Sequence, residues 1–285
     1  MDTILQILDR DSPLVVLGVY DAISAKIAEK VGFEVAFQTG YGTSASLFGM
    51  PDYGFVGATE TVDNARRICN AVQIPVIIDI DTGYGNALSV RRVVQALESA
   101  GASGIFLEDQ RWPKRCGHMT GKEVIPQAEY EEKLRAALDT RSSSDFVVVA
   151  RTDSRATGGI DEAIERATRN REIGADIIFV EAPRSIDEMR RIGREIRAPL
   201  VANMIEGGAT PLLPANDLYG MGFNLILYPV AALFASSLAI MRLAKSLKET
   251  GGTRGLEEDM LDFDQFNDLV RLSEYKELEK RYSSI

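Results

Sequence analysis

Ala100-Gly-Ala-Ser-Gly-Ile-Phe-Leu-Glu108 and Ile173-Gly-Ala-Asp-Ile-Ile-Phe-Val-Glu181 follow one plan: a helix end, a glycine, an apolar run and a terminal glutamate. Two further segments, Val31-Gly-Phe-Glu-Val-Ala-Phe37 and Met221-Gly-Phe-Asn-Leu-Ile-Leu227, repeat the first half of this plan. In each segment the glycine can take the left-handed conformation that ends a helix, after which the chain turns into a strand. The repeat therefore predicts alternating helices and strands.

Short apolar runs bounded by Gly, Pro, Asp or Asn recur along the whole chain. Most of them show no polar alternation, as expected for parallel strands that are covered on both faces. Amphipathic segments of helical length separate most of the runs, so the chain reads as a series of βα units. The eight predicted strands are 14–19, 35–38, 76–80, 104–108, 146–151, 176–181, 200–203 and 224–228.

Eight βα units in fewer than 300 residues favour an α/β fold of the (β/α)₈ TIM barrel type. A doubly wound sheet usually shows a glycine-rich phosphate turn early in the chain, and we find no such turn in the sequence. Polar residues at the ends of the predicted strands support the barrel, because these ends meet at one mouth. Helix N-capping explains one or two such acids but not all of them. The residues are Asp79, Asp81, Glu108, Asp109, Arg151, Asp153, Glu181 and Asn203.

Two of these carboxylates, Asp79 and Asp81, are two residues apart on a predicted strand, so we expect both on one face. They repel each other unless a cation lies between them. With Glu108 from the next strand they form an all-oxygen set, which suits Mg²⁺ with retained waters, or Mn²⁺. Capping and pairing with arginine are the structural alternative for these acids.

The loop sequence Lys114-Arg115-Cys116-Gly117-His118 places a thiol beside two cations and the one histidine of the chain. Nearby positive charges favour the thiolate, so the sequence predicts that Cys116 ionises easily near neutral pH. A basic surface loop with an incidental cysteine is the alternative. The segment 112–125 contains Gly117 and Gly121 and is a natural lid.

Composition excludes several classes of function. The chain has 285 residues, a formal net charge of −10 and two cysteines. No run of Lys or Arg is present, so we expect no nucleic-acid partner, and two cysteines make no disulfide framework. The longest apolar stretch, 229–241, is too short to cross a bilayer and is predicted to be a packed helix. We expect a single domain over 1–285, located in the cytoplasm and without a membrane partner.

Seven segments resemble the isocitrate lyase and phosphoenolpyruvate mutase superfamily, in order, from about residue 10 to 250. They are Gly18-Val-Tyr-Asp-Ala-Ile-Ser-Ala25, Thr39-Gly-Tyr-Gly-Thr-Ser-Ala-Ser46, Asp79-Ile-Asp-Thr-Gly-Tyr-Gly-Asn86, Leu107-Glu-Asp-Gln110, Lys114-Arg-Cys-Gly-His118, Ala150-Arg-Thr-Asp153 and Asn203-Met-Ile-Glu-Gly-Gly208. The resemblance implies a TIM barrel with Mg²⁺ that holds an enolate. It also implies a homotetramer in which the last barrel helix is exchanged between subunits, with a helical extension over about 230–285.

The resemblance also assigns roles position by position. The implied metal-proximal carboxylates, several of which act through water, are Asp79, Asp81, Glu108 and Asp52. The implied substrate contacts are Tyr41, Thr43, Ser44, Gly117, His118, Arg151, Glu181 and Asn203. In this superfamily the Lys-Arg-Cys-Gly-His loop marks carbon–carbon bond lyases. The implied catalytic residues are therefore Cys116, Lys114, Arg115, His118 and Tyr41.

Two departures from the superfamily bear on the substrate. Isocitrate and 2-methylisocitrate lyases hold an extra carboxylate with hydroxyls just after the asparagine, whereas Met204 and Ile205 cannot hydrogen-bond one. The loop also reads His118-Met-Thr-Gly-Lys122, where methylisocitrate lyases usually have Arg-Pro-Asn-Lys after the histidine. These features, and the stretch Glu277-Leu-Glu-Lys-Arg-Tyr-Ser-Ser284, are more similar to 2,3-dimethylmalate lyase, petal death protein and carboxyphosphonoenolpyruvate mutase.

The sequence thus predicts a Mg²⁺-dependent oxo-acid lyase acting on a small di- or tricarboxylate. Its substrate would be a 2-alkylmalate-type acid such as 2,3-dimethylmalate, cleaved to pyruvate or another 2-oxo acid and a short carboxylate, with Cys116 protonating the departing carbanion. Alternatives in the superfamily are 2-methylisocitrate lyase, oxaloacetate hydrolase and a phosphonomutase. Alternatives from other classes are a non-catalytic barrel that binds 2-oxo acids, and a cysteine hydrolase with Cys116 and His118 as nucleophile and base.

Overall fold

Eight parallel strands close into a barrel, in which each strand pairs with the next and β8 pairs with β1. The structure is a computed structural model that describes residues 2–119 and 121–283. The predicted TIM barrel and all eight predicted strands are confirmed, with differences of one residue at strand ends. The strands are β1 Leu14–Val19, β2 Ala36–Gln38, β3 Val76–Asp79, β4 Gly104–Glu108, β5 Val147–Thr152, β6 Ile177–Val180, β7 Leu200–Asn203 and β8 Leu225–Tyr228.

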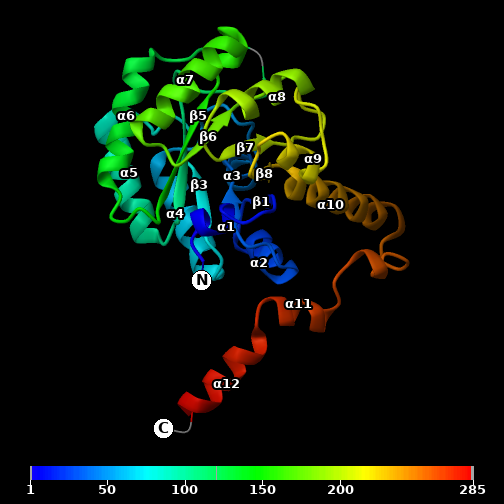
Figure 1. Ribbon diagram of the computed structural model, residues 1–285. Coiled ribbons are helices and arrows are strands. Elements are labelled where there is room, and N and C mark those ends of the chain that lie inside the picture. The colour runs from blue at the N-terminus through cyan, green and yellow to red at the C-terminus, as the bar shows by residue number, and fades with distance from the viewer. Residues whose placement is uncertain (1, 120, 284–285) are drawn as a thin grey trace. The chain divides into compact units, whose positions relative to one another are not determined.

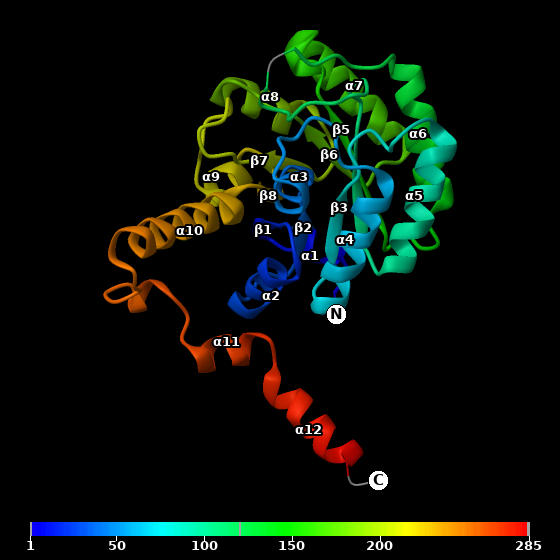
Figure 2. The same cartoon turned by 180° about the vertical axis from the view of Figure 1, so that it is seen from behind.

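Helices cover the outside of the strands (Figures 1 and 2). The glycines of the sequence repeat end helices as predicted, because Gly32, Gly101, Gly174 and Gly222 have φ of 96°, 93°, 120° and 102°. The helices up to β8 are α1 Ile4–Leu8, α2 Ala22–Val31, α3 Gly40–Phe48, α4 Ala58–Ala71, α5 Ala87–Ala100, α6 Gln127–Thr140, α7 Gly159–Ile173, α8 Ile186–Glu195 and α9 Ala215–Gly220, with a 3₁₀ turn at Ser154–Ala156.

The barrel has two hydrophobic cores. One core fills the space between strands and helices, and the other fills the barrel interior. The interior core includes Ile4, Ile7 and Leu8 of α1, so this short helix contributes to the interior packing. Alternate strands contribute one layer near the carboxyl ends, as is usual in TIM barrels: Phe37 from β2, Phe106 from β4, Phe179 from β6 and Leu227 from β8.

The chain divides into two compact units, the first ending at Ala231 and the second beginning at Ala232. The second unit contains all but the first residue of α10 Ala231–Thr250, a 3₁₀ turn at Glu257–Asp259, α11 Phe263–Leu269 and α12 Leu272–Ser283. None of the helices among residues 2–119 and 121–283 has both the length and the apolar character needed to cross a membrane.

The predicted packed helix over 229–241 is wrong for the single chain. In the described chain α10 buries none of its residues. Ile240 and Met241 are 65% and 62% exposed. Apolar side chains at helical spacing signal a buried face, but they do not show whether the burying surface comes from the same chain.

Candidate active site

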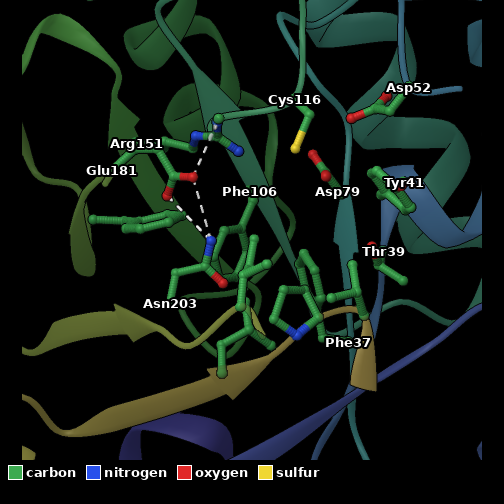
Figure 3. A pocket seen from close by; sticks show the side chains of 16 residues that line it. Phe37, Thr39, Tyr41, Asp52, Asp79, Phe106, Cys116, Arg151, Glu181 and Asn203 are labelled. Carbon is green, nitrogen blue, oxygen red and sulfur yellow. Dashed lines mark hydrogen bonds and ion pairs between the residues drawn. The ribbon is translucent and has the colours of Figure 1, made fainter. Parts of the chain in front are cut away.

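A pocket opens at the carboxyl ends of the strands. Four polar wall residues lie at strand ends: Asp79 closes β3, Arg151 lies in β5, Glu181 follows β6 and Asn203 closes β7. Figure 3 shows Cys116 between two groups of side chains, with Arg151, Glu181 and Asn203 on one side and Asp52 and Tyr41 on the other. The cavity measures about 40 Å³ and also has Thr39, Gly117, Ile205, Pro229 and Val230 in its walls.

The floor of the pocket is apolar. It is formed by the barrel layer of Phe37, Phe106, Phe179 and Leu227. The Phe37 and Phe106 ring centroids are 4.7 Å apart, and those of Phe106 and Phe179 are 5.9 Å apart. The Arg151 guanidinium lies over the Phe179 ring, 5.4 Å from its centroid. A floor of this kind excludes water below the polar wall and strengthens the electrostatic interactions above it.

The side chain of Lys114, a lid residue, lies in a cluster of carboxylates. Its Nζ lies 2.5 Å from Asp52 Oδ1 and 2.6 Å from Asp81 Oδ1, and all three side chains are buried. Burial opposes the charge on Lys114, but the carboxylates, Asp81 foremost, hold the pKa of its ammonium well above the ordinary value. Lys114 therefore stays charged and ties the lid to the barrel mouth.

The prediction that Asp79 and Asp81 share a face of one strand is wrong in its geometry. β3 ends at Asp79, and Asp81 has a φ of 50° outside the strand. The two residues remain close because the Asp81 backbone N–H donates to Asp79 Oδ1 at 3.0 Å. The Gly40 N–H also donates to Asp79, through Oδ2, at 3.2 Å.

Two carboxyl groups of the cluster resist ionisation. Burial raises the pKa of Asp81 to about 7, with Lys114 opposing the shift and Asp79 and Asp52 adding to it. Burial likewise raises the pKa of Glu108 well above its ordinary value, against the attraction of Arg151. Glu108 Oε1 is buried and has no hydrogen-bond partner among the described residues. The site therefore disfavours full ionisation of its own carboxyl groups.

A second network surrounds Arg151. Its Nε and Nη2 donate to the two oxygens of Asp153 at 2.8 and 3.0 Å, and Nη1 lies 3.1 Å from Glu108 Oε2. Asp153 is also bound by Lys122, whose Nζ lies 2.7 Å from Oδ1. Although burial opposes it, the charges of Arg151 and Lys122 hold the pKa of Asp153 well below the ordinary value. Arg151 is thus fixed with its remaining Nη donors available for an anion.

His118 closes the pocket from the lid. The Ala209 N–H donates to its Nδ1 at 2.9 Å, and Nε2 faces Glu181 Oε1 at 3.4 Å. Burial lowers the pKa of His118, against the attraction of Glu181, so the ring is neutral at pH 7 and carries its proton on Nε2. The Asn203 amide donates to both Glu181 oxygens at 3.3 and 3.2 Å. The ring is therefore not oriented as a base toward Cys116.

The prediction that Cys116 ionises easily is wrong. Burial raises the pKa of the Cys116 thiol to about 11, and the carboxylates of Asp52 and Glu181 add to the shift. The adjacent cations do not reverse it, because the Lys114 ammonium binds carboxylates and the Arg115 guanidinium lies over the Tyr53 ring, 5.7 Å from its centroid. Cys116 is a protonated thiol inside the pocket at neutral pH.

The remaining predicted residues divide into two groups. Tyr41 lines the pocket, and burial raises the pKa of its hydroxyl, with the nearby Asp52 carboxylate adding to the shift. Thr43 and Ser44 are buried outside the described cavity lining, with their hydroxyls donating to the carbonyls of Thr39, Met50 and Pro51. Ile205 lines the cavity, whereas Met204 belongs to the outer core. Thr120 of the lid lies outside the described residues.

The site was next tested for its fit to a metal ion. Among residues 2–119 and 121–283, no three His, Cys, Asp or Glu side chains converge as a ready-made metal cage. The carboxylates of Asp52, Asp79, Asp81, Glu108, Asp153 and Glu181 nevertheless outnumber the cations Lys114, Lys122 and Arg151 around the pocket. Excess negative charge, hard oxygen donors and the unpaired Glu108 oxygen fit a hydrated divalent cation with few direct protein ligands.

Sequence reasoning missed three residues that organise this site. Asp153 was recognised only as a polar strand end, and Lys122 only as part of the lid sequence. Gln110 has no role predicted from the sequence, yet its side chain forms hydrogen bonds with the Arg115 backbone. The signal for all three was their position next to assigned residues, but their partners become visible only in the folded chain.

Comparison with known proteins agrees with this geometry. Residues 4–248 match the family described as phosphoenolpyruvate phosphomutase. The chain is 48% identical over 284 residues to the chloroplastic carboxyvinyl-carboxyphosphonate phosphorylmutase of Arabidopsis thaliana, covering 98% of this chain and 84% of that protein. It is 44% identical over 279 residues to 2,3-dimethylmalate lyase of Eubacterium barkeri, covering 98% of this chain and 96% of that protein.

Solved structures give the same picture. Oxaloacetate acetylhydrolase in complex with the inhibitor 3,3-difluorooxalacetate superposes with a TM-score of 0.92 at 35% identity, covering 97% of this chain and 95% of that chain. Phosphonopyruvate hydrolase in complex with oxalate and Mg²⁺ superposes with a TM-score of 0.87 at 29% identity, covering 97% and 96%.

Proposed function

Because this chain belongs to the phosphoenolpyruvate mutase and isocitrate lyase superfamily, we propose that it is a Mg²⁺-dependent lyase for a small 2-alkylmalate-type acid. The relatives include carbon–carbon lyases, so the predicted enzyme class is confirmed. The proposed reaction cleaves an acid such as 2,3-dimethylmalate into pyruvate, or another 2-oxo acid, and a short carboxylate.

The mixed character of the pocket wall carries this proposal. One side holds the polar groups of Arg151, Glu181 and Asn203, while the floor and the Ile205 side are apolar. An alkyl-substituted dicarboxylate matches such a wall, because its carboxylate needs an arginine and its alkyl groups need apolar contacts. A third carboxylate placed against Ile205 would remain unpaired in a closed site, which is costly.

Mg²⁺ belongs to the proposal because a dianionic substrate would otherwise enter a site that already carries excess negative charge. Asp79, Asp81 and Glu108 would hold it, directly or through water, with Asp52 near them. The chemistry that the metal would supply is stabilisation of the negative charge that develops on the substrate's 2-hydroxyl oxygen. Mn²⁺ has similar ligand preferences and should substitute.

The chain's own residues supply binding, orientation and a proton. Arg151 binds a substrate carboxylate, and Asp153 fixes its orientation. Tyr41 remains a phenol at neutral pH and donates a hydrogen bond to a substrate oxygen. As the carbon–carbon bond breaks, the 2-hydroxyl group becomes the keto oxygen and gives its proton through water to the wall carboxylate of Asp79. Cys116, held as a neutral thiol, donates its proton to the departing carbanion. The lid brings this acid in and excludes water.

A substrate panel tests the proposal. Purified enzyme with Mg²⁺ is assayed with 2,3-dimethylmalate, 2-methylisocitrate, isocitrate and oxaloacetate, with detection of pyruvate, glyoxylate and oxalate. We expect the highest kcat/KM for the alkylated dicarboxylate, loss of turnover in EDTA, and recovery with Mg²⁺ or Mn²⁺. Fastest release of oxalate from oxaloacetate would instead assign a hydrolase, and full activity in EDTA would remove the metal from the proposal.

Assembly and location complete the proposal. A homotetramer that exchanges α10 would cover the apolar side chains this helix exposes. Cys69 and Cys116 are free cysteines, which suits the reducing conditions of the cytoplasm.

A further inference from the structure

The backbone on both sides of Cys116 is held by side chains that no assigned role explains. The described part of the lid around Cys116, 112–119 and 121–122, contains little regular secondary structure. Its own backbone hydrogen bond at Cys116, from the Met119 N–H to the Cys116 carbonyl at 2.9 Å, is local to the lid and does not tie the thiol to the barrel. Two side chains, Gln110 before the lid and Lys122 near its end, bond the peptide groups that flank Cys116.

Gln110 fixes the residue before the cysteine. Its Nε2 donates to the Arg115 carbonyl at 2.9 Å, and its Oε1 accepts from the Arg115 N–H at 3.0 Å. The side-chain amide thus pairs with both backbone groups of one residue, as a neighbouring strand would. Gln110 is 1% exposed, so these hydrogen bonds are shielded from competing water.

Lys122 fixes the residue after the cysteine. Its Nζ donates to the Gly117 carbonyl and to Asp153 Oδ1, in a fully buried position. Asp153 in turn holds Arg151. Gly117 must approach closely, since a Cβ there would lie 1.9 Å from Glu181 Oε1. The lid backbone after Cys116 is therefore bound to the same carboxylate that orients the substrate-binding arginine.

We propose that Gln110 and Lys122 are positioning residues that clamp the peptide on either side of Cys116 and so hold its thiol in the pocket. Neither side chain lines the described cavity, so they act through the backbone of Arg115 and Gly117. The catalytic role of this clamp rests on the proposed function. The position of the thiol can be tested without turnover.

The test is the alkylation rate of Cys116 by iodoacetamide, measured against Cys69 in the same molecule by peptide mass spectrometry. Cys69 lies in α4 outside the lid and is the internal reference for global opening, so a rise in the Cys116/Cys69 ratio reports local exposure of Cys116, including the easier ionisation that exposure brings. Gln110→Met and Lys122→Met keep side-chain length and remove the clamps. We expect each to raise the Cys116/Cys69 ratio about tenfold, the effect of losing a buried hydrogen bond.

Glu123→Gln is the matched control, because Glu123 neighbours Lys122 and its side chain forms an exposed ion pair with Arg111 at 3.1 Å, while its backbone bond to Arg111 is unaffected by the substitution. The Cys116/Cys69 alkylation ratio of Glu123→Gln should match that of the wild type. Global loosening would accelerate alkylation of both cysteines and leave the ratio unchanged. An unchanged ratio in both clamp variants, or an equal rise in Glu123→Gln, overturns the proposal.

Two further measurements complete the test. The first uses the wild type alone and therefore does not depend on how the variants fold, and the second tests the catalytic role of the clamp. In the wild type the Arg115 amide should exchange slowly with deuterium, and fast exchange would contradict the Gln110 clamp. In turnover both Met variants should lower kcat about 10-fold to 100-fold. Unchanged kcat in both would overturn the catalytic role, whereas failure of every substrate would count against the proposed function and leave the alkylation result standing.

Discussion

A buried thiol that remains protonated at neutral pH is suited to deliver a proton to a carbanion. Cys116 meets this condition because burial and the nearby carboxylates disfavour its thiolate. The same environment makes it a poor nucleophile. His118 does not activate it, since its Nδ1 accepts from Ala209 and its Nε2 faces Glu181.

Cys116→Ser should therefore lower kcat about 10²-fold to 10⁴-fold, the usual contribution of a positioned general acid. Oxalate binding in the presence of Mg²⁺ should stay close to wild type, because the carboxylates and Arg151 are untouched. Steady-state kinetics and calorimetry measure the two effects, with Cys69→Ser as the control. A covalent substrate adduct on Cys116 would favour the nucleophile reading instead.

Asp153 is the residue on which the second charge network depends. Arg151 and Lys122 hold its pKa below the ordinary value, so its charge stabilises the fold above about pH 4, where a free aspartate titrates. That stability is lost only as the pH falls through the lower folded pKa. Asp153→Asn should lower the free energy of unfolding by about 3 kcal/mol, because it leaves two buried cations without their partner.

Urea denaturation checks this prediction. The difference between wild type and Asp153→Asn should stay constant from pH 8 to pH 5 and shrink below pH 4. Asp187→Asn, which breaks an exposed pair with Arg190, is the control and should change the unfolding free energy little. A difference that already shrinks between pH 8 and pH 6 would mean that Asp153 titrates there.

Residue identity predicted where the polar groups gather, but not how they ionise or pair. Lys114 is adjacent to Arg115 and two residues from Cys116 in sequence, yet its ammonium binds Asp52 and Asp81. A pKa depends on burial and on all charges in the folded neighbourhood, and neither quantity follows from adjacency. The hydroxyls of Thr43 and Ser44 are likewise taken up by the local backbone.

At the scale of elements, the loop after β7 forms the wall that selects the substrate. Ile205 lines the cavity, while Met204 packs in the core. The wild type should turn over 2-methylisocitrate at least 100-fold less efficiently than 2,3-dimethylmalate, since an unpaired buried carboxylate is costly. Ile205→Ser should narrow this gap about tenfold.

The comparison uses kcat/KM for both acids, and Met204→Leu is the control because its volume is conserved outside the cavity. Equal kcat/KM for the two acids in the wild type would show that the extra carboxylate lies elsewhere. An unchanged ratio in Ile205→Ser would show that Ile205 does not face it.

The same loop meets the lid at Gly208. A Cβ at this position would lie 2.5 Å from His118 Nδ1 and 3.1 Å from the Ile205 carbonyl. Gly208→Ala should therefore displace His118, lower kcat about tenfold and speed alkylation of Cys116. Gly220→Ala, where a Cβ meets nothing within 4 Å, should leave both measurements unchanged. Normal activity in Gly208→Ala would mean that the two loops are not packed this way during turnover.

The elements themselves were largely predictable. Glycines before the strands and uninterrupted apolar runs marked where helices end and strands begin, and the folded chain places these glycines at positive φ. The end of β3 was harder to predict from the sequence. Asp81 has a left-handed backbone conformation that non-glycine residues rarely adopt, so alternation along the strand gave the wrong relation to Asp79.

At the scale of the whole molecule, the second unit exposes the apolar side chains that the proposed homotetramer would cover. Phe234, Ile240 and Met241 of α10 are exposed, and burying such side chains contributes about 2 kcal/mol each. Light scattering should give the mass of four chains. Ile240→Glu should weaken the assembly about tenfold or more, whereas Glu249→Gln on the same helix should not. A monodisperse monomer would contradict this prediction.

The floor of the pocket separates two parts of the barrel with different freedom to change. Phe37, Phe106, Phe179 and Leu227 close the interior core and are set by strand register, whereas Ile205, Gly208 and the lid lie beyond the strand ends. Where the buried ion pairs of Lys114 and Lys122 are kept, substitutions in those loops can change the accepted acid at a smaller cost in folding than substitutions in the floor. Substrate specificity is thus most easily changed through loop residues. A library of variants confined to the lid and the loop after β7 is the efficient starting point for evolving new specificities.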